Sequence, residues 1–597
     1  MPQKLRKYFT PQFLFSALFS LALLLGFPAP THGAEEATYN WAKTTGGTGY
    51  DGASDVAVDV VGNQYIVGEF TGTVDFDPGV GLDNQTATGR NTFLSKYASD
   101  GTYQWTKVMG GASTVVPTGG VVIDQSGDIF ISGGFQGTID FDPSGATDNY
   151  ISTGSYDIFL TKFLSDGSYA WTKTMGAAGW DYGYSIAIDS SGVYIGGDFT
   201  GTVDFDPGAG TDNHTSNLSR NSYFSKFAFD GSYQWTKTLG GDSSAVEGIA
   251  SDGNAVYITG SFYEGTTDFD PGAGTDNYTS NGLFDVFFSK YSTDGAYQWT
   301  KTVGGMGWDY GYSIAIDTSG DVYFAGGFSN TVDFDPSGGV DIKNEVGDAG
   351  EYDVFLSKYS SSGTYLWTNT VGGTSYEEAS GNHAIAFDSD GNIYWTGVFD
   401  LTVDFDTSVG IDEHTSNGLD PYNNDIFLTS YDSDGNYRFT QTWGGTAFDD
   451  AYAVAIFNNT LFVVGNFRNT VDFDPGAGTD NHTSNGSGDI YLSSFTLPTA
   501  PAEEALSDGH NKYYPLYQQY KKDYKNPGSK KKHTELKLLK RTNLPEFNRL
   551  KAVYHQYRLS GATYRKTLPQ TIQDDYHAYR KYRGYKQYLS YKEKANQ

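Results

Sequence analysis

The chain has 597 residues, no cysteine, and 71 Asp and Glu against 39 Lys and Arg, so its formal net charge at pH 7 is −32. The absence of cysteine excludes disulfide bonds, a thiol nucleophile and a lipid-modified cysteine anchor. We do not expect nucleic acid as the partner of so acidic a protein, because binding to phosphates depends on basic surface.

The first 34 residues predict an export signal. Lys4, Arg6 and Lys7 precede an apolar stretch over 13–27, and a short segment with small residues follows and ends at Ala34. This order is typical of a secretory signal peptide, here residues 1–34. We therefore expect a protein that is secreted or associated with the cell envelope. An uncleaved membrane anchor is the alternative.

The spacing Asp-x-Asp-x5-Asp then occurs seven times, and successive copies begin 64 to 71 residues apart. A recurring period of this size indicates a repeat architecture. The carboxylates are Asp75, Asp77 and Asp83; Asp140, Asp142 and Asp148; Asp204, Asp206 and Asp212; Asp268, Asp270 and Asp276; Asp333, Asp335 and Asp341; Asp404, Asp406 and Asp412; and Asp472, Asp474 and Asp480.

Each repeat predicts four short β-strands. In the third repeat they cover 185–189, 193–199, 223–227 and 233–238, and each is bounded by Gly, Asp, Asn or Ser. These segments alternate apolar and polar residues or are rich in β-branched and aromatic residues, which favours strands. Four strands in each of seven repeats predict an all-β protein, a seven-bladed β-propeller.

The ends of the repeat region predict how the ring closes. The last strand of each repeat carries an aromatic residue, and one more copy of this strand, around Trp41, precedes the first repeat. The seventh repeat ends at Phe495 without such a strand. We therefore expect the N-terminal strand to complete the last blade, in a propeller domain spanning 38–496. Alternating strand directions would place the tight turns on one face. The aspartate loops and blade-to-blade crossovers would lie on the other, where we expect binding.

The aspartate loops leave two interpretations open. Calcium takes roughly six to eight oxygen ligands from carboxylates, carbonyls and water, so the 21 aspartates above are candidate ligands and calcium is a candidate cofactor. The spacing resembles the calcium loops of integrin-type propellers. Position five, however, is glycine or serine, as at Gly208 and Ser144, where those loops carry aspartate. In the other interpretation the loop is a turn whose carboxylates accept backbone N–H groups.

Two crossovers carry the sequence Trp-Asp-Tyr-Gly-Tyr, at 180–184 and 308–312. Trp180, Tyr182, Trp308 and Tyr310 are candidate ligand-binding residues, because aromatic rings can stack on sugar rings. Packing between blades is the alternative. These features favour a monomeric binding or adhesion scaffold, with carbohydrate or a surface protein as the partner.

An enzyme is the competing class of function. Paired carboxylates on the long-loop face could hydrolyse an extracellular polysaccharide, but seven similar loops single out no pair. His214, His414 and His482 recur at one repeat position, as loop residues do, whereas a catalytic histidine is expected once. We therefore name no catalytic residue.

The composition changes after the last repeat. Residues 497–511 read as a linker, and 512–597 as a basic, tyrosine-rich extension that is partly helical or partly disordered. Residues 501–597 hold 21 Lys and Arg against 9 Asp and Glu, together with 14 tyrosines. Such a segment can be a plain appendage, can contact an anionic envelope polymer or a membrane surface, or can dock on the acidic propeller.

The repeat resembles the bacterial SBBP-type β-propeller repeat family. The resemblance rests on Asp-Val-Tyr followed by Thr-Val-Asp-Phe-Asp-Pro, as in 321–336, and on Asp-Val-Phe-Leu-Ser-Lys-Tyr up to the glycine pair, as in 353–373. It covers about residues 39–496 and implies a secreted or surface-associated propeller. It implies no activity and no catalytic residues.

Overall fold

The computed structural model describes residues 36–498 except 218, 242, 348–351, 380, 382, 409 and 419–422. The predicted signal peptide (1–34) and basic extension (512–597) lie outside these residues, as does the predicted linker (497–511) apart from Leu497 and Pro498. The chain divides into two compact units, Met1–Thr499 and Ala500–Gln597, and the described residues belong to the first. No helix among them has the length and apolar character needed to cross a membrane.

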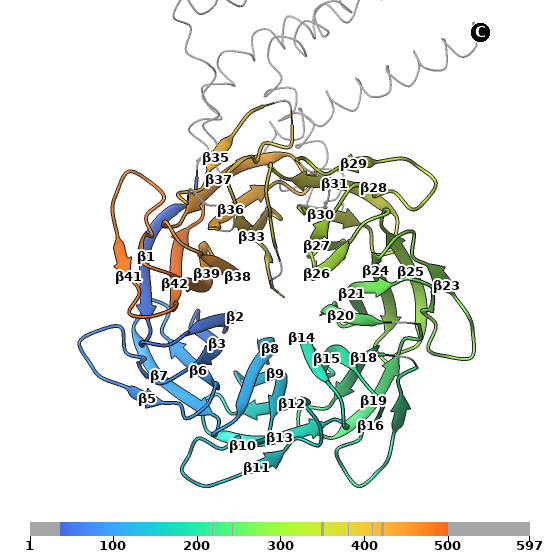
Figure 1. The fold of residues 1–597 in the computed structure, drawn as a ribbon, viewed down its shortest axis with the longest axis horizontal. Helices are drawn as coiled ribbons and strands as arrows, with labels where there is room; N and C mark the ends of the chain where they lie inside the picture. The colour runs from blue at the N-terminus through green and yellow to red at the C-terminus, as the bar shows by residue number, and fades with distance from the viewer. Residues whose placement is uncertain are drawn as a thin grey trace, which may run out of the picture. The chain divides into compact units, whose positions relative to one another are not determined.

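Seven four-stranded antiparallel blades form a ring (Figure 1), as the repeat predicts. The inner strands are β2 (Gly52–Val58), β8 (Thr114–Ile123), β14 (Tyr182–Asp189), β20 (Ser244–Ser251), β26 (Tyr310–Ile316), β32 (Ile385–Phe387) and β38 (Asp450–Phe457). The second strands are β3 (Gln64–Phe70), β9 (Ile129–Gln136), β15 (Gly192–Phe199), β21 (Ala255–Tyr263), β27 (Val322–Phe328), β33 (Ile393–Phe399) and β39 (Thr460–Phe467). We number the blades 1 to 7 in this order.

The outer half of each blade follows the same order. The third strands are β6 (Asn91–Tyr97), β12 (Asp157–Phe163), β18 (Asn221–Phe227), β24 (Phe284–Ser292), β30 (Asp353–Tyr359), β36 (Asp425–Tyr431) and β42 (Asp489–Thr496). The outer strands of blades 1 to 6 are β7 (Tyr103–Met109), β13 (Tyr169–Met175), β19 (Tyr233–Thr238), β25 (Tyr297–Val303), β31 (Tyr365–Val371) and β37 (Tyr437–Trp443).

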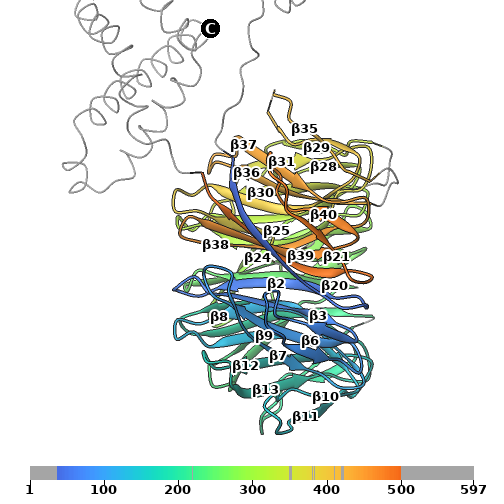
Figure 2. The same ribbon diagram turned by 90° about the vertical axis from the view of Figure 1, so that its left-hand side faces the viewer.

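The outer strand of blade 7 is β1 (Thr38–Thr45), which pairs antiparallel with β42. This confirms that the N-terminal strand closes the ring. The first and last repeats therefore lie next to each other, as β2 and β38 show in both views (Figures 1 and 2). The Tyr39 hydroxyl also donates a hydrogen bond to the Asp480 carboxylate of blade 7 at 2.5 Å.

A two-stranded ribbon leaves each blade between the second and third strands and lies at the periphery of the ring (Figure 1). The ribbons are β4 (Thr73–Asp75) with β5 (Asn84–Thr86), β10 (Thr138–Asp140) with β11 (Asn149–Ile151), β16 (Thr202–Asp204) with β17 (Asn213–Thr215), β22 (Thr266–Asp268) with β23 (Asn277–Thr279), β28 (Thr331–Asp333) with β29 (Ile342–Asn344), β34 (Thr402–Asp404) with β35 (Glu413–Thr415), and β40 (Thr470–Asp472) with β41 (Asn481–Thr483). Each ribbon contains one aspartate loop.

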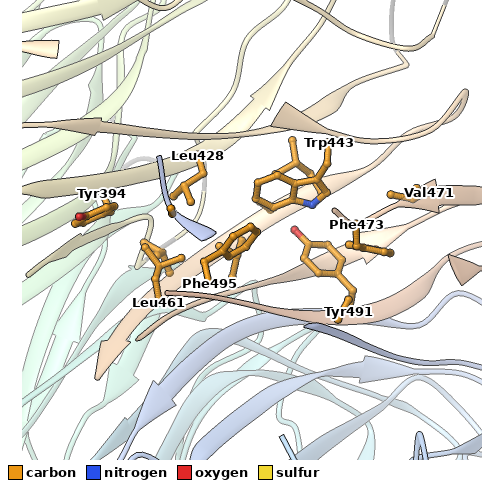
Figure 3. Packing of buried hydrophobic residues seen from close by; sticks show 14 of the residues in the cluster. Tyr394, Leu428, Trp443, Leu461, Val471, Phe473, Tyr491 and Phe495 are labelled. Atoms are coloured by element: carbon orange, nitrogen blue, oxygen red, sulfur yellow. The ribbon is translucent and has the colours of Figure 1, made fainter. Parts of the chain in front are cut away.

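The core consists of seven clusters of buried apolar side chains, and each cluster joins neighbouring blades. Figure 3 shows the cluster between blades 6 and 7, where Tyr394, Leu428 and Trp443 pack against Leu461 and Phe495. Burying one ring of this size stabilises a fold by about 2 kcal/mol. The phenylalanine of every Asp-Phe-Asp segment is also fully buried, so it is a packing residue.

Strand order separates two faces. The turn face carries the tight connections between inner and second strands and between third and outer strands. The crossover face carries the blade-to-blade crossovers, and the ribbons leave and rejoin the blades there, as Gly110 and Asp140 show by exchanging backbone hydrogen bonds. Strand order predicts the aspartate loops on this face, but they do not lie there, because each ribbon folds along the periphery and brings its loop beside the start of the outer strand (Figure 1). Neighbouring blades also meet on the turn face. A Cβ at Gly167 (φ +80°) would lie 2.8 Å from the Trp105 ring of the preceding blade, so only glycine fits that turn.

Candidate functional site

In each aspartate loop, the first two carboxylates accept hydrogen bonds from the loop's own backbone. In blade 3, Asp204 Oδ1 accepts the N–H groups of Asp206 (3.1 Å) and Asp212 (2.8 Å), and Asp206 Oδ1 accepts that of Gly208 (2.8 Å). The other six loops repeat this pattern. These carboxylates therefore shape the turn.

The third carboxylate of each loop accepts a hydrogen bond from a tyrosine hydroxyl at the start of the blade's outer strand. The pairs are Tyr103 with Asp83, Tyr169 with Asp148, Tyr233 with Asp212, Tyr297 with Asp276, Tyr365 with Asp341, Tyr437 with Asp412 and Tyr39 with Asp480. This tyrosine clasp ties the ribbon to the outer strand. Covering an edge strand in this way protects it from pairing with other chains.

The calcium assignment stays a prediction. In every loop, one oxygen of each carboxylate already accepts a hydrogen bond, and the loops lie apart around the ring (Figure 1). Within the described parts of 36–498, no three His, Asp or Glu side chains are arranged to hold a metal ion. His214, His414 and His482 each lie within 3.6 Å of the third carboxylate, so they belong to the ribbons, as a loop role predicts.

The crossovers brace the blades through a buried acid. In the two Trp-Asp-Tyr-Gly-Tyr segments these acids are Asp181 and Asp309, both at most 1% exposed. Asp181 accepts the N–H groups of Ala177 (2.7 Å) and Thr200 (2.8 Å), which joins the crossover to the end of β15. Burial raises the pKa of Asp181 to about 6 and that of Asp309 to about 7. These carboxylates are buried and hold the backbone of the crossovers.

A second buried acid, at the start of the third strand, lies near this brace across five of the blade junctions. The junction pairs are Asp489 with Asp51, Asp157 with Asp181, Asp285 with Asp309, Asp353 with Glu377 and Asp425 with Asp449. In four of them the charge of one acid raises the pKa of the other. The remaining two junctions lack the brace acid and carry Asn91 or Asn221 in place of the third-strand aspartate.

The predicted ligand-binding aromatics form two stacked ladders on the crossover face. In blade 3, Trp180 stacks on Tyr156 at 5.4 Å between centroids, Tyr156 on Tyr182 at 4.7 Å, and Tyr182 on Tyr184 at 5.6 Å. Packing between blades is therefore part of their role. Trp180 nevertheless remains 55% exposed, so its ring is also accessible to a ligand.

The second ladder, two blades away, has the same order. Trp308 stacks on Phe284 at 5.4 Å, and Tyr310 stacks on Tyr312 at 5.8 Å. Trp308 is 39% exposed. Trp180 with Tyr182 and Trp308 with Tyr310 thus form two separate aromatic sites on one face.

β-Bulges interrupt the regular alternation of side chains along the inner strands. The bulged positions include Ser54, Tyr184, Glu247, Tyr312 and Tyr452, each half-buried in an otherwise buried segment. A bulge turns a side chain away from the regular alternation of a strand. These residues lie near the starts of the inner strands, at their crossover-face ends. The inner strands surround the axis of the ring (Figure 1).

Glu247 is the acid of this group. It lies near Tyr184 of blade 3 and Tyr312 of blade 5, and its charge raises the pKa of both phenols, in each case after burial as the main cause. Burial, followed by the charge of Asp198, raises the pKa of Glu247 itself to about 7. Arg220 opposes this shift but forms its ion pair with Asp198, at 2.7 Å.

One histidine reaches across the ring. Nδ1 of His383, in blade 6, lies 2.9 Å from Oδ2 of Asp55 in blade 1. The same Asp55 oxygen accepts the N–H of Val121 in blade 2 at 2.7 Å. Burial works against a charge on His383, but Asp55 and the Ile186 backbone together hold its pKa above the usual value. Single-sequence reasoning missed this pair, because its partners are 328 residues apart and nothing local marks them.

Comparisons with known proteins agree with a repeat protein but assign no activity. No family model matches the chain. An uncharacterized WD repeat-containing protein, L264, of Acanthamoeba polyphaga mimivirus is 25% identical over 354 residues, 47% of this chain and 25% of that protein. The regulatory protein FlaEY of Caulobacter vibrioides is 30% identical over 268 residues, 42% of this chain and 25% of that protein. The chain thus spans about a quarter of each relative.

Among solved structures, the phage phi92 endosialidase aligns with 78% of this chain and 70% of its own, at 11% identity and a TM-score of 0.29. So low a score adds nothing to the strand order, which itself establishes the seven-bladed propeller.

Proposed function

We propose that this protein is an exported β-propeller that binds carbohydrate on its crossover face. The observation that carries the proposal is the pair of aromatic ladders, each with an exposed tryptophan at its outer end, Trp180 and Trp308. Stacked partners fix these rings in place, so little side-chain entropy would be lost when a sugar ring packs on them. The resemblance of the repeat to SBBP-type propellers supports export.

The proposal includes an orientation of the propeller, with the turn face toward the attachment surface and the crossover face away from it. The described chain enters the propeller before β1 and leaves it after β42, and both points lie at the turn face: the N–H of Leu497 donates to the carbonyl of Asn459, in the tight turn after β38. A basic extension that attached to an anionic envelope polymer or a membrane surface would then leave the crossover face free for its ligand.

A glycan array with the full chain tests the proposal. Binding should fall strongly in the double variant Trp180→Ala, Trp308→Ala. It should persist in Leu366→Ala, which removes a 45% exposed side chain from the outer strand β31. Equal binding by all three proteins, or no glycan bound by the wild type, would refute it.

A polysaccharide-degrading enzyme is the alternative, and one observation favours it. A carboxyl with a pKa of about 7, as for Glu247, is protonated in part near neutral pH, as a general acid must be. Hydrolysis assays on the glycans that bind separate the two functions: turnover that disappears in Glu247→Gln supports an enzyme, and binding without turnover supports a binding module.

A further inference from the structure

A cavity of about 200 Å³ opens on the crossover face between blades 5 and 6. Its lining consists of four tyrosines, two glutamates and a glycine: Tyr310, Tyr312, Gly327, Tyr352, Tyr376, Glu377 and Glu378. None of the described residues of the lining is Lys, Arg or His. The cavity is therefore aromatic and negatively charged.

A change in the repeat creates this cavity. Between blades 2 and 3 the corresponding space is filled: a Cβ on Gly134 would lie 2.6 Å from the ring of Tyr182. Between blades 5 and 6, Glu378 occupies the repeat position of Tyr182, and Gly327 that of Gly134. A Cβ on Gly327 would meet nothing closer than Tyr352, at 3.6 Å. A carboxylate thus occupies the position at which blades 3 and 5 carry a tyrosine ring.

The tyrosines form walls at different angles around this carboxylate. The rings of Tyr310 and Tyr352 lie 6.1 Å apart at 41°, and those of Tyr352 and Tyr376 lie 5.9 Å apart at 84°. The Tyr376 hydroxyl donates a hydrogen bond to Glu378 Oε2 at 2.7 Å. The Glu378 backbone is held by exchanged hydrogen bonds with Val398, at 3.1 and 2.8 Å, so its side chain is directed by the strand.

We propose that this cavity binds a small organic cation, an ammonium group carried on a short carbon skeleton. The faces of tyrosine rings attract a cation, and Glu378 supplies the opposite charge at the same place. An anionic ligand would be repelled by both glutamates. A hydrated metal ion would gain little from four aromatic walls, since hard cations prefer oxygen ligands.

The inference goes beyond the proposed function, because it requires neither Trp180 nor Trp308 and concerns a different class of ligand, although Tyr310 belongs both to the second ladder and to the cavity lining. The ammonium group has two possible sources, a free amine or an amino substituent on a polymer. The experiment below separates them.

Isothermal titration of the full chain at constant NaCl tests the cation, with choline as the probe and 3,3-dimethylbutan-1-ol, its uncharged carbon analogue, as the comparison. We expect choline to bind at least about tenfold more tightly than the alcohol, a difference of 1.4 kcal/mol. Equal binding of the two, no binding of choline, or full displacement of choline by equimolar Ca²⁺ would overturn the proposal.

Variants at one position locate the site. Glu378→Gln keeps the volume of the side chain and should weaken choline binding at least about tenfold. Glu378→Tyr restores the residue found at this position in blades 3 and 5, should fill the cavity, and should abolish binding without unfolding the protein. Glu264 is an exposed glutamate after β21 in blade 4. The variant Glu264→Gln loses the same charge and should bind choline normally. Loss of binding in Glu264→Gln, or unchanged binding in Glu378→Tyr, would refute the site.

The source of the ammonium is tested in the same titration with an oligosaccharide of glucosamine and its N-acetylated form. Tighter binding of the amino form than of choline assigns a polymer-borne ammonium. Weaker binding of the amino form assigns a free amine. Equal binding of the amino and N-acetylated forms would contradict a cation site.

Discussion

Replacing Asp425 by Asn should make the propeller more stable at alkaline pH. Asp425 begins β36 and is 1% exposed. Its Oδ2 accepts hydrogen bonds from the backbone and the side chain of Asn417, both at 2.9 Å, whereas its Oδ1 is buried with no hydrogen-bond partner among the described residues. Two of the seven blades already carry Asn at this position, Asn91 and Asn221. In blade 3 the amide oxygen of Asn221 accepts the Asn217 N–H, as Asp425 accepts that of Asn417.

The magnitude follows from linkage. Burial, which outweighs the hydrogen bonds of Asn417, raises the pKa of Asp425 from 3.8 to about 7. Between these values the folded protein binds more protons than the unfolded chain, so its stability is greatest at low pH and falls as pH rises. A folded pKa about three units above the unfolded pKa corresponds to about 4 kcal/mol of unfolding free energy in all. About 2 to 3 kcal/mol of this stability is lost between pH 5 and pH 8. Asn cannot ionise and removes this loss.

Urea unfolding at pH 5 and pH 8 measures the effect. The difference in unfolding free energy between the two pH values should be about 2 to 3 kcal/mol smaller in Asp425→Asn than in the wild type. Asp390→Asn, at an exposed turn, loses the same charge and should leave the difference unchanged. An unaltered difference in Asp425→Asn would show that this carboxyl titrates normally in the folded protein and would refute the reasoning.

Four further predictions concern other parts of the ring. Tyr297→Phe removes the donor of one tyrosine clasp and should cost about 1 to 2 kcal/mol in urea unfolding, whereas Tyr263→Phe in the same blade should cost less. The raised pKa of His383 stabilises the fold below pH 6.5, so the stability lost in His383→Gln should shrink as pH rises through the folded pKa; a constant difference would contradict this. A chain that begins after Thr45 leaves β42 unpaired and should aggregate or melt earlier, and the peptide 36–46 added in trans should restore its melting temperature. Calcium should raise the melting temperature if the aspartate loops bind it, and identical melts with calcium and with chelator would leave them as turns.

The blades and their closure could be predicted because each strand is marked by its own residue pattern and the strands of each repeat can be counted. Alternating residues mark the strands of the third repeat, and the surplus strand at Trp41 matches the missing one after Phe495. The ribbons were not predicted, since three-residue strands such as β17 carry too short a pattern. The clasp had a visible signal, because each tyrosine of blades 1 to 6 follows its aspartate by 20 to 25 residues.

The candidate site was harder to predict than the blades, because it depends more on tertiary structure. Trp180 and Trp308 could be chosen from their motif, but the same motif did not reveal that Asp181 and Asp309 are buried braces. Which side chain a β-bulge redirects depends on strand register, so Glu247 carried no mark in the sequence. The cavity at Glu378 arises from a missing ring, and an absence is visible only when seven junctions are compared in space.

The pairing of β1 with β42 has a consequence for how the molecule forms. Thr45 lies beside Ile490, so the first strand to be synthesised has no partner until nearly all of the propeller exists. Contacts that join such distant parts of a chain form slowly. The ring therefore cannot seal while the polypeptide is still emerging, and closure has to wait until the seventh repeat has been made.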